Sequence, residues 1–565
     1  MKEKFDVIVV GAGPAGSAAA LTLAREGYDV LMVEKAQLPG QRNVSGGVLF
    51  GGFRDGLGLI DLIPEFEHEA PVERKISAHE LYLLSKPVRK NDEWRYRYLK
   101  FDKNSFLTHL GLTMLNASSG HDYTVLRTRF DRWMASKAVE AGAMLATSKT
   151  VEDLVFKDGR VAGVLTQDEE LHADMVIDCS GVTSLLPEKA GIRPRLTSDQ
   201  VYHGVKHVLK VSPQKIEEFF KIDDGFKTLY LLGPFMHGVV GGGFVYPNRD
   251  TLSVGVVVGL SSAIPVFTSQ FNKIGKPFEM LNEMESHPFL AEVLANAKLV
   301  EYSAHNIPRG YKVLPEKPYA GGFLMAGDAL GVFYKIGALI DGIRPAIASG
   351  ILAARAYIHA KKQGDFSAST LSVYRQLLEP LYKLVAKSKT NSALIERKIS
   401  YSNGSLFLLK LGLGRSAAAK SVNMENSGRN VLQTVQQMTG LLDYHEDKVR
   451  SHIEVNQALA SADKEKAWIP MCPVNCYTLV TGKGVFASFK DLYAYNLETL
   501  RKNRADDRMA FKKAIEATLE DIRTGQLKFD HVACVACGTC GVIGPPAVVR
   551  FGHEWNGRGV RFRYG

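Results

Sequence analysis

The feature that most constrains the fold is a strand–glycine–helix–strand pattern in the first 34 residues. Phe5–Val10 is a short β-branched run typical of a buried strand, and a small-residue helix over Ser17–Glu26 precedes a second strand over Tyr28–Val33. Between the first strand and the helix stand three glycines at the spacing G-x-G-x-x-G: Gly11, Gly13 and Gly16. Glu34 ends the second strand about 20 residues after these glycines.

The glycines and the acid have defined roles in nucleotide binding. The glycines permit a tight turn, a close approach of the backbone to a pyrophosphate and close packing of the helix on the strand. The helix N-terminus attracts the phosphates, and a carboxylate at the position of Glu34 accepts hydrogen bonds from the ribose hydroxyls. We therefore expect a Rossmann-like α/β domain with a bound dinucleotide.

Two later segments favour FAD as that dinucleotide. Phe323–Gly331 is a predicted strand that ends in Gly327-Asp328, and it resembles the second FAD motif of flavoprotein hydroxylases and reductases, whose aspartate holds the ribityl chain. Gly342 precedes a proline and a run of helix formers, which marks a helix start. A helix N-terminus at the flavin pyrimidine edge would stabilise negative charge on reduced flavin. The alternative is a plain amphipathic helix.

One element of such flavoproteins is altered. Many carry an Asp-Gly pair after a central strand, whereas here Ala173–Asp178 runs into Cys179-Ser180-Gly181. Serine takes the place of the aspartate, and Gly181 remains as a cofactor-binding candidate.

A second cofactor signal lies near the C-terminal end. Cys534-Val-Ala-Cys537-Gly-Thr-Cys540 follows the start of the bacterial iron–sulfur pattern C-x2-C-x2-C-x3-C-P, with Gly544 in place of the fourth cysteine. In two-cluster ferredoxins that fourth cysteine serves the other cluster, so its loss spares the first cluster. The first cluster still needs a remote ligand followed by proline, and Cys472 precedes a proline. We expect one [4Fe–4S] cluster on these four cysteines.

Alternatives remain for the cysteines. Cys476 could replace Cys472 as the fourth ligand, although the proline after Cys472 favours the latter. Zinc is an alternative to the cluster, but zinc sites usually arrange their cysteines as two separated C-x2-C pairs, which differs from the three cysteines at successive x2 spacings here. The thiols could also be structural, as expected for Cys179. Disulfides are not expected, because nothing marks a secreted chain and five of the six cysteines lie in the last hundred residues.

Composition limits the partners and the location. The 565 residues are 45% hydrophobic and 23% charged, with a formal net charge of +10, which fits a soluble multidomain protein. The charge suits an anionic membrane or an acidic protein, and without a long basic tract we expect no nucleic acid as a partner. No signal peptide or spanning helix is visible. We expect a peripheral protein at the cytoplasmic face of the cell membrane.

The glycine fingerprint, the Gly-Asp motif and the cysteine run, in this order, resemble the electron-transfer flavoprotein:quinone oxidoreductase family, in the form of a FixC-type flavoprotein joined to a FixX-type ferredoxin-like protein. The resemblance extends over nearly the whole chain. It implies flavin contacts from Arg42, from the loop Ser45-Gly46-Gly47 and from Arg127 in a strand-to-helix segment.

The resemblance also implies a glycine loop beside a quinone head group, formed by Gly241 and Gly242. The alternative is a tight turn between strands, where glycine supplies positive φ. Backbone N–H groups freed by such a loop could still donate to a quinone carbonyl, since glycine also marks a close approach of a ligand.

A function follows from the resemblance. It implies electron transfer from a reduced electron-transfer flavoprotein, with alpha and beta subunits, through the cluster and FAD to a membrane quinone, within a Fix-type electron-bifurcating complex. FAD suits the link because it holds one or two electrons, and we expect no acid–base catalytic residue. Two rivals remain: a geranylgeranyl-reductase-like enzyme acting on a lipid, and a non-catalytic electron relay.

Four parts are expected along the chain. They are an FAD-binding domain (1–75, 110–195 and 315–375, with a hairpin over Val151–Val164), a β-rich quinone or substrate domain (76–109 and 196–314), a helical segment (376–465), and a ferredoxin-like α+β domain (466–565) with a helical insertion over Asp491–Thr524.

The helical segment contains a candidate membrane contact, Ser405–Arg415. Leu406, Leu409 and Leu413 fall on one helical face, and basic side chains suited to anionic head groups stand nearby: Lys410, Arg415 and Lys420. The alternative is an apolar stripe buried against the β-rich domain.

Overall fold

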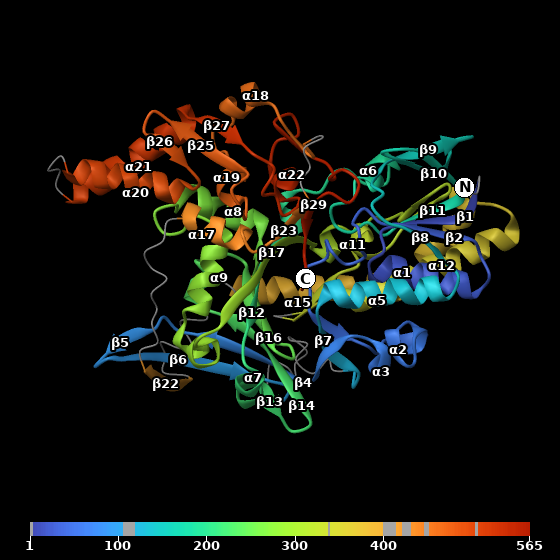
Figure 1. The fold of residues 1–565 in the computed structure, drawn as a ribbon, viewed down its shortest axis with the longest axis horizontal. Helices are drawn as coiled ribbons and strands as arrows, with labels where there is room; N and C mark the ends of the chain where they lie inside the picture. Colours follow the sequence, from blue (N-terminus) through green and yellow to red (C-terminus); the bar gives the residue numbers. More distant parts are fainter. Residues whose placement is uncertain are drawn as a thin grey trace.

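The structure is a computed structural model, and it describes the following residues: 4–105, 119–336, 339–398, 414–420, 431–445, 451–502 and 507–565. Two large sheets lie beside each other, and a smaller cysteine domain, residues 466–565, packs across them (Figure 1). The C-terminus lies near the middle of the molecule, between these parts (Figure 1).

The first sheet contains the predicted nucleotide-binding pattern. Its strands lie in the order β18 (Tyr319–Ala320), β19 (Phe323–Met325), β11 (Glu170–Asp178), β1 (Phe5–Val10), β2 (Val30–Val33) and β8 (Met144–Ala146). Every pair from β19 to β8 is parallel. The helices packed with it are α1 (Pro14–Arg25), α5 (Arg127–Glu140) and α12 (Ile343–Gln363). All of β2 is buried, as expected for a covered parallel strand.

A hairpin extends this sheet, as predicted for Val151–Val164. Strand β9 (Val151–Lys157) pairs antiparallel with β10 (Arg160–Thr166), which continues to β11. The two turn residues Asp158 and Gly159 have φ of 51° and 75°. Positive φ at both central positions is the geometry of the type I′ turn that suits strand twist.

The second sheet is mostly antiparallel. Its main strands lie in the order β17 (Lys298–Pro308), β12 (Val201–Lys210), β16 (Thr251–Gly259), β15 (Gly241–Pro247), β14 (Gly225–Leu232), β4 (Val72–Leu84), β6 (Glu93–Phe101) and β22 (Arg415–Lys420). Its core contains side chains of α8 (Leu260–Ser269) and α9 (Pro277–Glu285), and the same core continues into the cysteine domain.

The segment 376–465 is only partly helical, so that prediction needs a correction. Helices α15 (Glu379–Lys398) and α17 (Val431–Thr439) are present, but Arg415–Lys420 forms β22 and pairs antiparallel with β6. An edge strand has unpaired N–H and C=O groups, and pairing with β22 satisfies those of β6. Apart from Gly414 and Arg415, the candidate membrane contact Ser405–Arg415 lies outside the described residues.

The cysteine domain has small sheets and two long helices. Its elements are α19 (Trp468–Met471), β25 (Tyr477–Thr481), β26 (Gly484–Phe486), α20 (Phe489–Lys502), α21 (Asp507–Thr524), β27 (Gln526–Phe529), α22 (Thr539–Ile543), β28 (Val549–Phe551) and β29 (Gly559–Arg561). Helices α20 and α21 confirm the predicted helical insertion and project from one end of the molecule (Figure 1). Strand β28 pairs with β24 (Ile453–Val455), and β29 pairs with β23 (Asp443–His445).

Short elements complete the chain. They are β3 (Val48–Phe50), α2 (Leu59–Leu62), α3 (Phe66–Glu69), β5 (Val88–Lys90), β7 (Asp122–Val125), α6 (Leu186–Lys189), α7 (Pro213–Phe220), β13 (Lys221–Ile222), α10 (Pro288–Leu294), α11 (Gly327–Leu330), β20 (Tyr334–Ile336), β21 (Leu339–Asp341), α13 (Ala368–Leu371), α14 (Val373–Leu377) and α18 (Gln457–Ala462). Among the described helices, none has the length and apolar character needed to span a bilayer.

Candidate functional site

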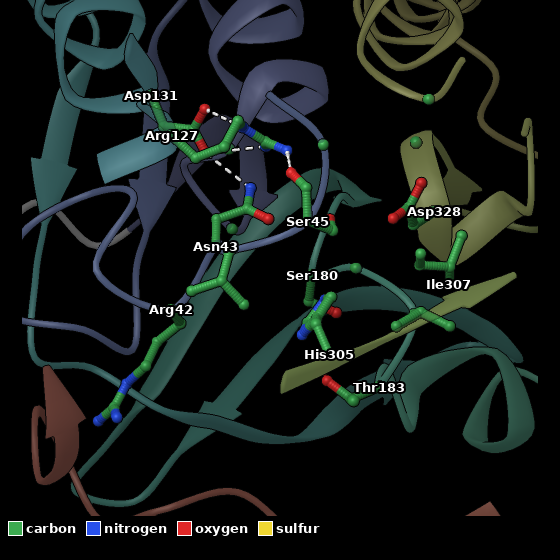
Figure 2. A pocket seen from close by; sticks show the side chains of 18 of the residues that line it. Arg42, Asn43, Ser45, Arg127, Asp131, Ser180, Thr183, His305, Ile307 and Asp328 are labelled. Atoms are coloured by element: carbon green, nitrogen blue, oxygen red, sulfur yellow. Dashed lines mark hydrogen bonds and ion pairs between the residues drawn. The ribbon is translucent and has the colours of Figure 1, made fainter. Parts of the chain in front are cut away.

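A cavity lies where the two sheets and the cysteine domain meet (Figure 2). The first sheet and its loops contribute most of the predicted cofactor residues to its wall: Gly11, Gly13, Glu34, Arg42, Ser45, Gly46, Arg127, Gly181, Gly327, Asp328 and Gly342. The second sheet contributes side chains from β12, β15 and β17, and the cysteine domain contributes Val535, Ala536 and His553. The motifs read from distant parts of the sequence therefore converge on one site.

Of the three fingerprint glycines, Gly11 and Gly13 line the cavity and Gly16 lies behind it. A β-carbon at Gly16 would lie 1.9 Å from the carbonyl oxygen of Gly11. Gly11 itself has φ of 97°, and a β-carbon there would lie 2.6 Å from the carbonyl oxygen of Cys179. The first and third glycines thus permit the turn and the close contact of helix α1 with β1, as the motif predicts.

Glu34 is held at the end of β2 by the backbone. Its Oε2 accepts a hydrogen bond from the Ala12 N–H at 3.0 Å, and its Oε1 accepts one from the Ala36 N–H at 2.9 Å. The carboxylate lines the cavity next to the fingerprint loop. This position suits the predicted acceptor of ribose hydroxyls.

Arg127 organises the loop around Ser45 (Figure 2). Its Nε and Nη2 donate to the two carboxylate oxygens of Asp131, each at 3.0 Å, and its Nη1 donates to the Ser45 carbonyl. Asn43 Nδ2 donates to Asp131 at 2.6 Å. Burial raises the pKa of Asp131, while Arg127 and Asn43 oppose this rise. Arg127 lines the cavity, and it also holds the loop in place through a bidentate pair.

Arg42 lies at the cavity wall, but its guanidinium is directed toward the C-terminal tail. It donates to the carbonyl oxygens of Arg558 and Val560, and its Nη1 lies 3.6 Å from Glu554 Oε1. In Figure 2 its side chain extends away from Asp131 and Ser45. The link from Arg42 to the cysteine domain is a role that sequence reasoning missed.

Asp328 and Gly342 lie at the start of two helices that face the cavity. Asp328 is in α11, directly after β19, and burial raises the pKa of its carboxyl group to about 6. Gly342 caps α12, which confirms the predicted helix start. Behind this cap, Arg344 Nε donates to Asp341 Oδ2 at 2.7 Å and packs on the Phe50 ring.

The altered segment keeps an acid at Asp178, the last residue of β11, two residues before the usual position. Asp178 Oδ1 accepts hydrogen bonds from the Ser180 N–H and hydroxyl at 3.0 and 2.6 Å, and its Oδ2 accepts one from Ser184 at 2.7 Å. Burial raises the pKa of Asp178, and these donors oppose the rise. Asp178 thus stabilises the turn that brings Gly181 to the cavity.

The second sheet supplies a wall that the motifs did not indicate. Lys206 in β12 pairs in register with Ser303 in β17, and Gly204 pairs with His305. Lys206 Nζ donates to the Val44 carbonyl at 2.7 Å, and burial lowers its pKa to about 7. Burial, with Lys35 and Arg127 nearby, lowers the pKa of His305 to about 3. The sequence shows the alternation of apolar and polar residues in these strands. It does not show which face of the second sheet packs against the first sheet.

Gly47, Gly241 and Gly242 do not line this cavity. Gly47 lies against the Tyr246 ring, where a β-carbon would be 3.1 Å from Cδ2. Gly241 and Gly242 belong to strand β15, so the expected glycine loop is part of the sheet. A β-carbon at Gly241 would lie 1.9 Å from the Val257 carbonyl oxygen in the next strand, which accounts for glycine there by close packing.

Five cysteines gather in the cysteine domain. Cys476 is within hydrogen-bonding reach of Cys472 and Cys534, and Cys540 interacts electrostatically with both of these. Cys537 interacts with Cys534 and Cys540. In the part of the chain that the structure covers, no group of three or more His, Cys, Asp or Glu side chains is arranged to hold a metal ion.

The cysteine loop is docked on the second sheet beside the cavity. Thr539 Oγ1 donates to Asn306 Oδ1 at 2.8 Å and lies 2.8 Å from His203 Nδ1. The Cys537 thiol donates to Thr539 Oγ1 at 3.4 Å. Ala536, between two of the predicted ligands, lines the cavity. The cysteine loop and the cofactor-binding residues therefore share one wall.

Comparisons with known proteins agree with this site. Residues 6–205 match the FAD dependent oxidoreductase family, and residues 202–307 match the ETF-QO, ubiquinone-binding family. Protein FixC of Escherichia coli O157:H7 is 39% identical over 379 residues, which cover 66% of this chain and 81% of FixC. The chain belongs to the FixC and electron-transfer flavoprotein-quinone oxidoreductase family. The expected resemblance and the expected FAD are confirmed.

One further relative and one solved structure are similar to this chain. The probable electron transfer flavoprotein-quinone oxidoreductase YdiS of Escherichia coli K12 is 34% identical, over 67% of this chain and 82% of YdiS. A geranylgeranyl bacteriochlorophyll reductase-like structure from Thermoplasma acidophilum superposes with a TM-score of 0.54 at 21% identity, covering 77% of this chain and 99% of that one. The likeness to this solved structure confirms the FAD-dependent oxidoreductase fold. It is a likeness of fold alone and gives no support to the lipid-reductase alternative.

Proposed function

We propose that this FixC-family chain accepts electrons from a reduced electron-transfer flavoprotein, made of alpha and beta subunits, and delivers them to a membrane quinone. FAD and one [4Fe–4S] cluster on Cys472, Cys534, Cys537 and Cys540 are the carriers. We place the protein at the cytoplasmic face of the cell membrane, as a peripheral member of a Fix-type electron-bifurcating complex. The match to the ubiquinone-binding family and the similarity to the probable electron transfer flavoprotein-quinone oxidoreductase YdiS support this proposal.

The observation that carries the proposal is the position of Ala536. This residue lies between Cys534 and Cys537 in the sequence, and it lines the same cavity as Gly11 and Asp328. A carrier held by the cysteine loop is therefore next to the flavin pocket. Short separation between carriers is what a chain that passes electrons between them requires.

The chemistry of the residues around the cysteines supports the proposed iron–sulfur cluster. Thiolates are the ligands of such clusters, and five thiols gather here from two segments. The buried Tyr477 hydroxyl has no hydrogen-bond partner among the described residues. Both amide atoms of Asn475 are buried without a hydrogen-bond partner within the described ranges. Because Cys476 is close to both Cys472 and Cys534, it stays the alternative fourth ligand.

The chain's own residues bind and position the cofactors. Glu34 offers its carboxylate at the ribose position, and the Arg127–Asp131 pair keeps the Ser45 loop against the cavity. When bound, FAD supplies the link between one-electron and two-electron carriers. Lys206 and His305 form the opposite wall, and burial lowers the pKa values of both. This lowering limits the positive charge beside the flavin position.

The quinone position stays a proposal at Gly241 and Gly242. Both lie in the region matched to the ubiquinone-binding family. Their neighbours include the methyl groups of Met236 and Leu232, at 3.1 and 3.0 Å from the positions of added β-carbons.

The test is anaerobic quinol formation by the FAD- and iron-loaded protein with reduced partner flavoprotein and a quinone. We expect turnover by the wild-type chain. We expect none by Cys540→Ser. Absence of turnover with any quinone, despite full FAD and iron, refutes the proposal. If flavin and cluster are then reduced, the chain is an electron relay.

A further inference from the structure

One lysine reaches from the second-sheet side into the cysteine domain. Lys276, just before α9, is completely buried. Its Nζ donates to the carbonyl oxygens of Ile469, Cys472 and Val474 at 2.9, 3.0 and 3.0 Å. Three acceptors match the three hydrogens of an ammonium group, whereas a neutral amine has two. The contact pattern is that of a charged lysine held by one loop.

This loop carries the predicted fourth cluster ligand. The three carbonyls captured by Lys276 flank or belong to Cys472, and the Tyr302 hydroxyl in β17 donates to the Pro473 carbonyl at 2.8 Å. The carbonyls of residues 472, 473 and 474 are thus all held by side chains from outside the cysteine domain. The position of Cys472 depends on residues some 170 to 200 positions earlier, as the sequence separations of 171, 196 and 198 show.

The charge of Lys276 also acts on the thiols. Its Nζ lies 3.0 Å from the carbonyl oxygen of Cys472, so this charge is fixed beside a predicted cluster ligand. A charge buried at low dielectric interacts more strongly with its neighbours than one at the surface. Reduction adds one negative charge to an iron–sulfur cluster, and net charge and hydrogen bonds around a cluster set its potential. A fixed positive charge favours the reduced form.

We propose that Lys276 is a positioning residue for the cluster: its ammonium group holds the Cys472 loop in the ligating arrangement and makes the cluster easier to reduce. The inference rests on the cluster of the proposed function. It adds a residue beside the second sheet, Lys276, through which the contact between this sheet and the cysteine domain influences the reduction potential of the cluster.

The test uses the anaerobically reconstituted full chain with Lys276→Met, which removes charge and donors, and Lys276→Gln, which removes the charge but keeps an amide donor. The matched control is Lys490→Met, which removes a half-buried ammonium at the same interface, where Lys490 pairs with Glu279 at 2.8 Å. The cluster midpoint potential is measured by an EPR-monitored redox titration, with iron and FAD quantified in the same samples.

For both Lys276 variants we expect cluster reduction at least about tenfold less favourable than in the wild type, a shift of about 59 mV to lower potential for a one-electron couple. Loss of iron with FAD retained also supports the proposal, because the ligand loop is then no longer held. A wild-type potential in both variants with full iron overturns it. Loss of iron and FAD together counts against a role confined to the cluster.

A second readout separates this inference from the proposed function. In iron-free protein, alkylation of Cys472 is followed by peptide mass spectrometry, with Cys179 as the internal reference. We expect faster alkylation of Cys472 in Lys276→Met than in the wild type, and an unchanged rate overturns the clamp. If the wild type holds no iron after reconstitution, the cluster of the proposed function fails, while the alkylation result still decides the role of Lys276.

Discussion

The guanidinium of Arg42 and the carboxylate of Glu554 face each other at 3.6 Å, and both groups are largely buried. Lys35 adds a second cation 3.8 Å from Glu554. The two basic residues flank the nucleotide-binding strand end and the Ser45 loop, whereas Glu554 belongs to the cysteine domain. This ion pair therefore couples the flavin-binding part of the chain to the part that carries the cysteines.

Glu554→Gln should destabilise the protein by about 3 kcal/mol, because it removes the buried carboxylate that Arg42 and Lys35 share. We expect a lower thermal midpoint and easier loss of FAD, measured by calorimetry and flavin fluorescence. Glu498→Gln, an exposed member of a helical pair in the same domain, should change stability by no more than about 0.5 kcal/mol. Equal effects of the two substitutions would contradict a coupling role for Glu554.

The same carboxylate predicts a pH dependence. Arg42 and Lys35 outweigh burial and hold the pKa of Glu554 well below its usual range. A depressed folded-state pKa adds stability above the unfolded pKa, and this stability is lost as pH falls below about 4. The stability difference between wild type and Glu554→Gln should therefore shrink in acid. A difference that stays constant from pH 7 to pH 3 would rule this out.

Arg127→Lys should weaken FAD binding by about tenfold, since lysine keeps the charge but cannot form the fork that binds both oxygens of Asp131 and still reach the Ser45 carbonyl. The measurement is the dissociation constant of FAD by fluorescence titration. Arg129→Lys provides the control on the same helix, because Arg129 is exposed and its partner is Glu73. Comparable losses in both variants would argue against a specific role for the Arg127 pair.

Gly16→Ala should prevent proper folding of the nucleotide-binding part. Its β-carbon would lie 1.9 Å from the Gly11 carbonyl oxygen, a backbone clash that costs about 3 kcal/mol or more. Gly482→Ala is the control, because nothing lies within 4 Å of a β-carbon there. We expect insoluble or FAD-free protein for the first and normal protein for the second. Soluble Gly16→Ala protein with full FAD would show that the close contact is not needed.

Asp328 predicts a pH effect of opposite sign in the FAD-free protein. Burial raises its folded-state pKa to about 6, above the ordinary value of about 3.9, so its protonated form contributes stability that is lost as pH rises from about 4 to 6. Asp328→Asn cannot ionise, so the stability of this variant relative to wild type should increase across that window. Urea unfolding of both proteins at pH 4 and pH 7 measures it, and parallel pH profiles would refute it.

The local motifs of the chain were readable because their geometry is local. The Gly11–Gly16 turn, the acid Glu34, the hairpin turn at Asp158 and the cap at Gly342 each depend on a few neighbouring residues, and the structure shows each of them. Glycine and helix-start patterns carry such information directly in the sequence.

The remaining site residues depend on contacts between distant segments. Lys206 lies in the middle of an ordinary strand, and only the packing of the two sheets brings its ammonium to the Val44 carbonyl. The partners of Arg42 lie more than 500 positions away. Strand β22 was read as helical because its pairing with β6 is a tertiary effect. The glycines of β15 are explained by close packing against the next strand. From the sequence alone, a run of glycines in a strand looks the same as a glycine loop.

The tail that meets Arg42 also sets an order of events during synthesis. Glu301 accepts hydrogen bonds from the backbone N–H groups of Arg563, Tyr564 and Gly565, and Thr128 donates to the carbonyls of Arg563 and Tyr564. Translation produces the nucleotide-binding strands and helix α5 first, yet Arg42 and Thr128 obtain these partners from residues 558–564. The wall of the flavin pocket around Arg42 can therefore reach its finished form only after residues 554–560 have been synthesised.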